Sequence, residues 1–294
     1  MPTSRGHGLL LGCLFFLLAG TLVVLAFSVL SGGPGPGSGF GLWSQEKVGL
    51  VLVEGPIVDS QPAVDELEAN RRDRSVKAVV IRLDSPGGEV APSQEIHEAV
   101  RRLADTKPVV ASFGSVAASG AYYIAVAADT IVSTGGCLTG SIGVIFAYPT
   151  LRELMEKAGI EMEVFKSGEL KDMGTFAREA TEDEEAVFDG MVADVFDQFV
   201  TAVADGRDLE RTRVLEIADG RVFTGRQAVE LGLVDRIGDL HAAVELAATM
   251  GGLPPDPPVA RKARPPLPFL DVIDRFLRDQ ARAAWGPRLE YRLR

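Results

Sequence analysis

The chain has 294 residues and a formal net charge of −11. Its length allows one large domain or two small ones with a sizeable core. The acidic balance, with Lys and Arg scattered through acidic stretches, argues against nucleic acid as a partner. Of the two cysteines, Cys13 lies in an apolar N-terminal run and Cys137 is alone in the remainder, so no disulfide can form within that remainder.

An apolar segment begins the chain. Leu9 to Leu30 is 22 residues without a charge, and a helix of that length is roughly 33 Å long, which matches the hydrocarbon thickness of a bilayer. A cleavable signal peptide is the alternative, but its apolar core is typically about 7–15 residues, so residues 1–31 are predicted to hold an uncleaved transmembrane anchor. Arg5 precedes the span and the next basic residue is Lys47. The positive-inside rule then predicts a single-pass cell-membrane protein with a cytoplasmic N-terminus and an extracytoplasmic remainder.

Residues 32–45 are predicted to form a flexible linker. The run GGPGPGSGFG (32–41) combines entropically costly glycines with prolines that lack a donor. These glycines superficially suggest a phosphate loop, but no strand precedes them and two prolines interrupt them. We therefore expect no nucleotide and no other cofactor.

From residue 46 to residue 250 the chain alternates short β runs with helices. The first β runs, at 48–55, 78–88 and 108–114, are nearly continuous in Val, Ile and Leu, as expected where helices cover both faces of a sheet. This pattern predicts an α/β domain. The other predicted elements are helices at 61–73, 91–104, 119–129, 150–158, 181–205, 224–232 and 239–249, and β runs at 131–136, 137–146 and 161–168.

The composition changes abruptly at Gly251. Residues 251–267 are predicted to be a Pro-rich basic linker, and residues 268–294 a C-terminal amphipathic helix and tail. Phe269 and Ile273 illustrate the helical spacing of the apolar residues in that last segment. Such a helix could lie on a membrane or pack on a partner subunit, and we favour packing.

Few residues outside the apolar run can carry chemistry. His97 and His241 lie on predicted helices among ordinary surface residues, and no HExxH or CxxC motif offers a zinc ligand set, so no metal is expected. Cys137 lies in a Gly-rich turn with no nearby base, which favours a structural role. A serine with a lysine base remains, because a lysine held in an apolar pocket loses its proton more readily.

Three segments suit such chemistry. Ser119 in GSVAASGAYY (114–123) lies at a predicted strand-to-helix turn, where the following amide of Gly120 can donate to an oxyanion. The glycines of DSPGGEV (84–90) can approach a substrate and supply a second donor. Lys171 lies in the loop KSGELKDMG (166–174). Taken singly, the serine is more often a helix cap, the glycines a turn and the lysine a surface residue.

Their combination and order are more specific. The segment from Val48 to Leu246 resembles the signal peptide peptidase A (SppA) family, serine peptidases related to the Clp protease and crotonase fold. The resemblance rests on five stretches that occur here in the family's order: LDSPGGEV, GSVAASGAYYIAVAAD, LTGSIGV, FKSGELKDMGTFAREAT and IADGRVFTGRQAVELGLVD.

The resemblance implies a role for each site residue. Ser119 would be the nucleophile, Lys171 the general base, the amides of Gly88 and Gly120 the oxyanion hole, and Ser141 the hydroxyl that orients the lysine. It also implies a Clp protease/crotonase-like fold of repeated ββα units, in a short single-copy form assembled as a ring of eight. Signal peptides left in the membrane after export, and some misfolded exported proteins, would be the substrates.

Two departures from the family pattern concern specificity. Ala121 stands where a second glycine is common, and Asp84 stands where Asn is usual. Neither removes the Gly120 amide, so activity is expected. The predicted catalytic loops are rich in Gly, Ala, Val and Ile, which suits small or medium apolar side chains of a peptide.

Two other functions fit less well. A crotonase-like enzyme acting on coenzyme A thioesters would not need Ser119 together with Lys171, and a membrane anchor would be unusual for it. A catalytically inactive scaffold that binds peptides at the membrane would not need an intact Ser119, Lys171 and Ser141.

Overall fold

The computed structural model describes residues 45–261 and 288–292 of the chain. The predicted anchor, almost all of the first linker and the predicted helix at 268–285 lie outside these residues. Among the helices of the described part, none is long and apolar enough to cross a membrane.

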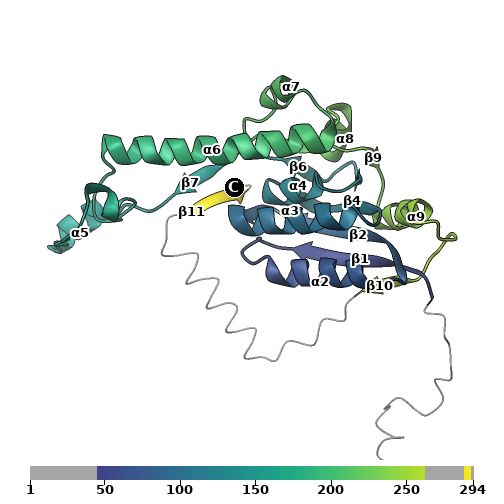
Figure 1. Ribbon diagram of the computed structural model, residues 1–294. Coiled ribbons are helices and arrows are strands. Elements are labelled where there is room, and N and C mark those ends of the chain that lie inside the picture. The colour runs from purple at the N-terminus through teal and green to yellow at the C-terminus, as the bar shows by residue number, and fades with distance from the viewer. Residues whose placement is uncertain (1–44, 262–287, 293–294) are drawn as a thin grey trace, which may run out of the picture. The chain divides into compact units, whose positions relative to one another are not determined.

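A mostly parallel sheet forms the centre of the fold, with the strand order β10-β1-β2-β4-β5-β9 (Figure 1). Two short strands extend it beyond this path, because β6 pairs in parallel with the end of β4, and β8 pairs antiparallel with β6. This arrangement confirms the predicted α/β class. The strands are β1 (Lys47–Glu54), β2 (Val76–Ser85), β4 (Val109–Ala118), β5 (Thr130–Ser133), β6 (Leu138–Gly140), β8 (Val222–Thr224), β9 (Arg236–Ile237) and β10 (Val259–Arg261).

Helices cover both faces of this sheet. On β2, the alternate residues Val79 and Ile81 belong to the larger apolar core, whereas Ala78 and Val80 belong to a second, smaller core. The larger core packs against α2 (Gln61–Arg72), α3 (Val90–Ala104) and α4 (Gly120–Ala125), and the smaller against α9 (Leu240–Met250). Burial on both faces explains the continuous apolar runs of the sequence.

The long helix α6 (Glu182–Arg207) begins with a capping box, in which Thr181 and Glu184 exchange side-chain and backbone hydrogen bonds. Its C-terminal half packs into the larger core through Phe199, Val200 and Val203. The short helices α7 (Arg211–Leu215) and α8 (Gly225–Glu230) follow it.

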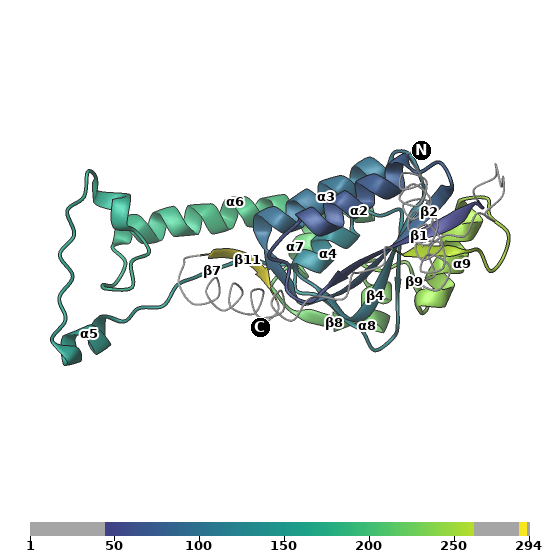
Figure 2. The same cartoon turned by 90° about the horizontal axis from the view of Figure 1, so that it is seen from below.

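An extended segment, residues 151–181, precedes α6 and is here named the arm. It contains α5 (Arg152–Ala158) and the 3-10 helix η1 (Glu169–Asp172), neither of which has a buried residue. Figures 1 and 2 show α5 beyond the N-terminal end of α6, away from the strands of the main sheet.

The structure corrects three predictions. Residues 161–168 form no strand, because they lie exposed in the arm with no strand beside them. The Pro-rich segment 251–267 is not linker throughout, because the proline-free residues of β10 pair in parallel with β1. In the predicted C-terminal helix and tail, residues 288–292 form the strand β11 (Arg288–Arg292).

A second, three-stranded sheet holds this last strand. Its order is β3-β11-β7, with β3 (Gly87–Glu89) and β7 (Ile145–Ala147) at the edges. Both pairings are antiparallel. Figure 2 shows β11 and β7 side by side below α6.

Candidate active site

Ser119 lies directly between β4 and α4, in a backbone conformation with φ 54° and ψ −116°. Residues other than glycine rarely adopt such positive φ values, and the backbone strain costs about 1–3 kcal/mol. Two hydrogen bonds hold the turn: the Ser119 N–H donates to the Gly140 carbonyl, and the Tyr123 N–H donates to the Ser119 carbonyl, both at 2.8 Å. The Ser119 hydroxyl is buried and has no hydrogen-bond partner among the described residues. A strained turn thus presents an unpaired hydroxyl.

Two glycine segments meet beside this serine. A Cβ atom built on Gly87 would lie 2.8 Å from the Gly120 nitrogen, so only glycine allows β3 to approach the start of α4. Ile57 binds one edge of β3, by donating to the Gly87 carbonyl (2.9 Å) and accepting from the Glu89 N–H (2.8 Å). Because strand groups alternate in direction, the N–H of Gly88 points to the opposite edge. The two predicted oxyanion donors, Gly88 and Gly120, therefore lie on neighbouring segments.

Asp84 shapes the end of β4 that leads to Ser119. Its carboxylate accepts hydrogen bonds from the N–H groups of Ser115 (3.0 Å) and Val116 (3.2 Å), where the pairing of β2 with β4 changes register. A Cβ atom on Gly114 would lie 2.4 Å from the Asp84 carboxyl carbon. Either an Asp or an Asn oxygen can accept these bonds, which explains why Asp is tolerated here.

Ser141 lies near the nucleophile through β6. It follows Gly140, whose carbonyl accepts the Ser119 N–H, and it has a φ of 51° and is buried. The Thr139 hydroxyl donates to the Ala117 carbonyl at 2.6 Å, which fixes β6 against β4. Ser119 and Ser141 thus follow the ends of two strands, β4 and β6, whose backbones are hydrogen-bonded to each other.

Lys171 is not joined to Ser119 within this chain. It is exposed on η1 in the arm, and the Ser119 hydroxyl has no partner among the described residues. Ion pairs order the arm around it: the Asp172 carboxylate contacts Lys166 at 2.9 Å and Arg178 at 3.0 Å. These contacts hold the pKa of Asp172 down at about 2, chiefly through the Arg178 hydrogen bond.

The residues set aside on sequence grounds lie in structural positions. Burial lowers the pKa of His97, whose ring centroid lies 4.8 Å from that of Tyr123. Cys137 is buried, which raises the pKa of its thiol and disfavours the reactive thiolate. Within the described part of the chain, no group of three or more His, Cys, Asp or Glu side chains could hold a metal ion.

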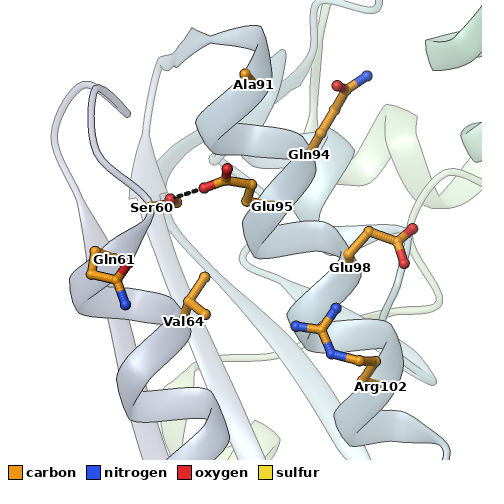
Figure 3. Close-up of a pocket in the computed structure, with 8 residues that line it drawn as sticks. All are labelled: Ser60, Gln61, Val64, Ala91, Gln94, Glu95, Glu98 and Arg102. Carbon is orange, nitrogen blue, oxygen red and sulfur yellow. Dashed lines mark hydrogen bonds between the residues drawn. The ribbon is translucent and has the colours of Figure 1, made fainter.

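An open hollow between α2 and α3 contains none of the predicted site residues (Figure 3). The Ser60 hydroxyl donates to Glu95 across it, and Arg102 lies at its other end. Its charged lining differs from the glycine-lined surroundings of Ser119.

Sequence reasoning missed one residue at the site, Tyr291 of β11. Its side chain is fully buried, its ring stacks on Tyr123 at 5.2 Å, and its hydroxyl donates to the Val195 carbonyl at 3.2 Å. The alternation of apolar and charged residues in RLEYR (288–292) is a strand signal that could have found it.

Comparison with known proteins adds a family likeness. The profile described as Peptidase family S49 matches residues 101–253. A protein of Synechocystis sp. named as a protease is 42% identical over 214 residues, covering 72% of this chain and 77% of the relative. A protein of Enterococcus faecium named as a signal peptide peptidase SppA is 37% identical over 216 residues, which cover 69% of this chain and 63% of the relative. The chloroplastic serine protease SPPA of Arabidopsis thaliana is 35% identical over 70% of this chain and 31% of its own length.

Proposed function

Because the chain belongs to peptidase family S49, the SppA family, and is therefore a serine peptidase, we propose that it hydrolyses apolar peptides with a Ser119–Lys171 dyad. The observation that carries the proposal is the Ser119 hydroxyl, which is buried and unpaired among the described residues and lies on a strained turn beside the Gly120 amide. Such a hydroxyl can react without first breaking a hydrogen bond to another residue of the described chain.

The reaction proceeds in two steps. The Ser119 Oγ attacks the peptide carbonyl while its proton passes to the neutral Lys171 amine, and the amides of Gly88 and Gly120 donate to the oxyanion. The C–N bond then breaks and the leaving amine takes that proton. Water, deprotonated by the same lysine, hydrolyses the acyl-enzyme and restores Ser119. Ser141 orients the lysine.

A neighbouring subunit supplies the lysine. In support, the arm that carries Lys171 is exposed, and it presents large apolar side chains to solvent, as expected of a surface that contacts a partner. A second copy in a closed head-to-tail ring places the arm of one protomer at the Ser119 of the next. Burial there would remove water from the amine and favour its neutral form, which is the form that can act as a base. The exposed apolar residues of the arm include Leu154, Ile160, Met162, Val164, Phe165 and Leu170.

The location and substrate complete the proposal. Residues 1–31 anchor the chain in the cell membrane with the peptidase domain outside the cytoplasm, in a ring of eight on a Clp protease/crotonase-like fold. The Enterococcus relative is named as a signal peptide peptidase. Signal peptides, which are apolar and left near the membrane, are the substrates that suit this position.

Mixing two inactive variants tests both the dyad and its origin. Ser119→Ala and Lys171→Ala should each abolish peptide hydrolysis. After subunit exchange in an equal mixture, about a quarter of the interfaces pair an intact serine with an intact lysine, so about a quarter of wild-type activity should return. The measurement is the hydrolysis rate of a fluorogenic apolar peptide.

Two results would contradict the proposal. Substantial turnover by either single variant removes the dyad, and inactive rings of proven mixed composition place both residues within one chain. A Lys157→Ala variant serves as the matched control, since Lys157 lies on α5 of the same arm and is not one of the partners of Asp172 that order the segment around Lys171. It should retain catalysis.

A further inference from the structure

The 3-10 helix η1, which carries Lys171, is bound at both ends by one lysine. The Lys166 ammonium donates to the Glu169 carbonyl at 2.8 Å, at the first residue of η1, and to the Asp172 carboxylate at 2.9 Å, at its last residue. The Lys171 N–H donates to the Gly168 carbonyl at 3.1 Å. These bonds all lie within residues 166–172, so they shape η1 without tying it to any other element.

Arg178 supplies such a tie. Its guanidinium lies between two carboxylates, donating to both oxygens of Asp172 at 3.0 and 3.4 Å and to both oxygens of Glu184 at 2.6 and 2.8 Å. A guanidinium presents its N–H groups in a fixed plane, so paired bonds of this kind fix direction as well as distance. They hold η1 at a defined place relative to α6, on which Glu184 lies.

Glu184 is a firm attachment point for this tie. Its side chain is only 1% exposed, and it also accepts the Thr181 N–H at 2.9 Å in the capping box of α6. The Arg178 hydrogen bond holds the pKa of Glu184 below its ordinary value, so the carboxylate is ionised near neutral pH. The helix that it caps continues into the larger core, where Phe199 and Val203 are fully buried (Figure 1). A continuous path of contacts therefore leads from the core to η1.

A second arginine at the base of the arm makes a different set of contacts. Arg152 pairs with Glu156 at 3.6 Å and with Glu179 at 3.0 Å, and these three side chains are between 43% and 74% exposed. Both partners lie outside η1 and α6, and exposed ion pairs of this kind contribute little to stability. Arg152 is therefore a matched control for Arg178.

We propose that Arg178 is a positioning residue for the base, holding η1 on α6 so that Lys171 enters the site in one place. This inference rests on the proposed function, in which the Lys171 amine takes the serine proton. The guanidinium acts through the Asp172 carboxylate, which is next in sequence to the lysine. Proton transfer needs the amine within hydrogen-bond reach of the hydroxyl, and a misplacement of about 1 Å can cost about a hundredfold in rate. Cutting the link should therefore slow the chemical step and spare peptide binding.

Kinetics of matched arginine variants test the link. Arg178→Gln should lower kcat for a fluorogenic apolar peptide at least about tenfold and leave KM within about twofold. Arg152→Gln should leave both constants within about twofold of wild type. Arg178→Lys keeps the charge but not the paired bonds, so its kcat should lie between those of Arg178→Gln and wild type. An Arg178→Gln variant with the kcat of wild type, or with a loss carried by KM alone, overturns the inference.

A second variant keeps the inference testable if Arg178→Gln disturbs α6, which unfolding midpoints will show. Asp172→Asn cuts the link at η1 and leaves Arg178 paired with the buried Glu184. It should also lower kcat and spare KM. The double variant should be no slower than the slower single variant, because both changes break the same contact. Losses that multiply in the double variant overturn the inference.

Complementation separates this inference from the proposed function. After subunit exchange with Ser119→Ala, which brings an intact arm, Arg178→Gln should regain about a quarter of wild-type activity. Exchange with Lys171→Ala should add nothing, and a gain there overturns the inference by placing Arg178 with the serine. Persistent turnover in Lys171→Ala overturns the dyad and this inference with it. An inactive Lys171→Ala beside a fully active Arg178→Gln overturns this inference alone.

Discussion

At the scale of single residues, the site depends on conformations that few side chains tolerate. Ser119 and Ser141 both have positive φ. Ser119 directly follows β4 and Ser141 directly follows β6, and the ends of these two strands pair with each other. Positions of this kind persist only where the surrounding structure fixes them. At Ser119 two hydrogen bonds fix the backbone: the Ser119 N–H donates to the Gly140 carbonyl, and the Tyr123 N–H donates to the Ser119 carbonyl.

Replacing the serine by glycine should therefore stabilise the protein while it abolishes activity. Glycine adopts φ 54°, ψ −116° without steric conflict, whereas alanine keeps the strain. The free energy of unfolding of Ser119→Gly should therefore be about 1 kcal/mol higher than that of Ser119→Ala. Urea unfolding of the two inactive variants measures the difference. A glycine variant less stable than the alanine variant would show that the turn is unstrained.

At the scale of elements, the sequence predicted what local pattern determines. The seven predicted helices occur within a few residues of α2 to α6, α8 and α9, whereas the short helix α7 was not predicted. The α/β class followed from apolar runs buried on both faces. The segment 161–168 has the composition of a strand but lacks a partner, and pairing cannot be read from one strand alone. β10 and β11 were missed because their partners, β1 and β3, lie about 200 residues away in sequence.

In the candidate site too, residues in local motifs could be predicted, and residues that depend on distant contacts could not. Ser119, Gly120 and Gly88 were predicted from motifs, and the structure brings their segments together because β3, β4 and α4 are adjacent. The dyad with Lys171 stays a prediction, since one chain leaves the arm apart from Ser119. The alternation in RLEYR could have predicted a strand, but the packing of Tyr291 against Tyr123 and Phe199 is a contact between residues distant in sequence, which no local pattern specifies.

The arm should loosen in acid before the sheet does. The pKa of Asp172 is about 2 in the folded arm against an ordinary value of 3.8, because Arg178 and Lys166 bind its ionised form. Its stabilising effect is complete above pH 3.8 and is lost as the pH falls toward 2. Hydrogen exchange, corrected for intrinsic rates, should show residues 166–181 losing protection over that range while β1 and β2 keep theirs.

A charge variant provides the control for the acid experiment. Arg178→Gln removes the largest cause of the lowered pKa of Asp172, so protection of the arm should become low and nearly independent of pH between 4 and 2. Unchanged protection of the wild-type arm at pH 2 would mean that these ion pairs do not order it.

At the scale of the whole molecule, the proposed division of the site between protomers would make activity depend on assembly. In the described part of the chain the Ser119 hydroxyl has no hydrogen-bond partner, so if the proposed rings supply the base, specific activity should fall on dilution as they dissociate. Hydrolysis rates measured against protein concentration, with the ring population from mass photometry, test this. Constant specific activity in a solution of single protomers would contradict it.

The place of β11 has a further consequence for solubility. Without it, β3 and β7 would each present an unpaired strand edge, and such edges recruit strands from other molecules. By pairing these two edges with the strand β11 of the same chain, the protein keeps them from recruiting strands of other molecules.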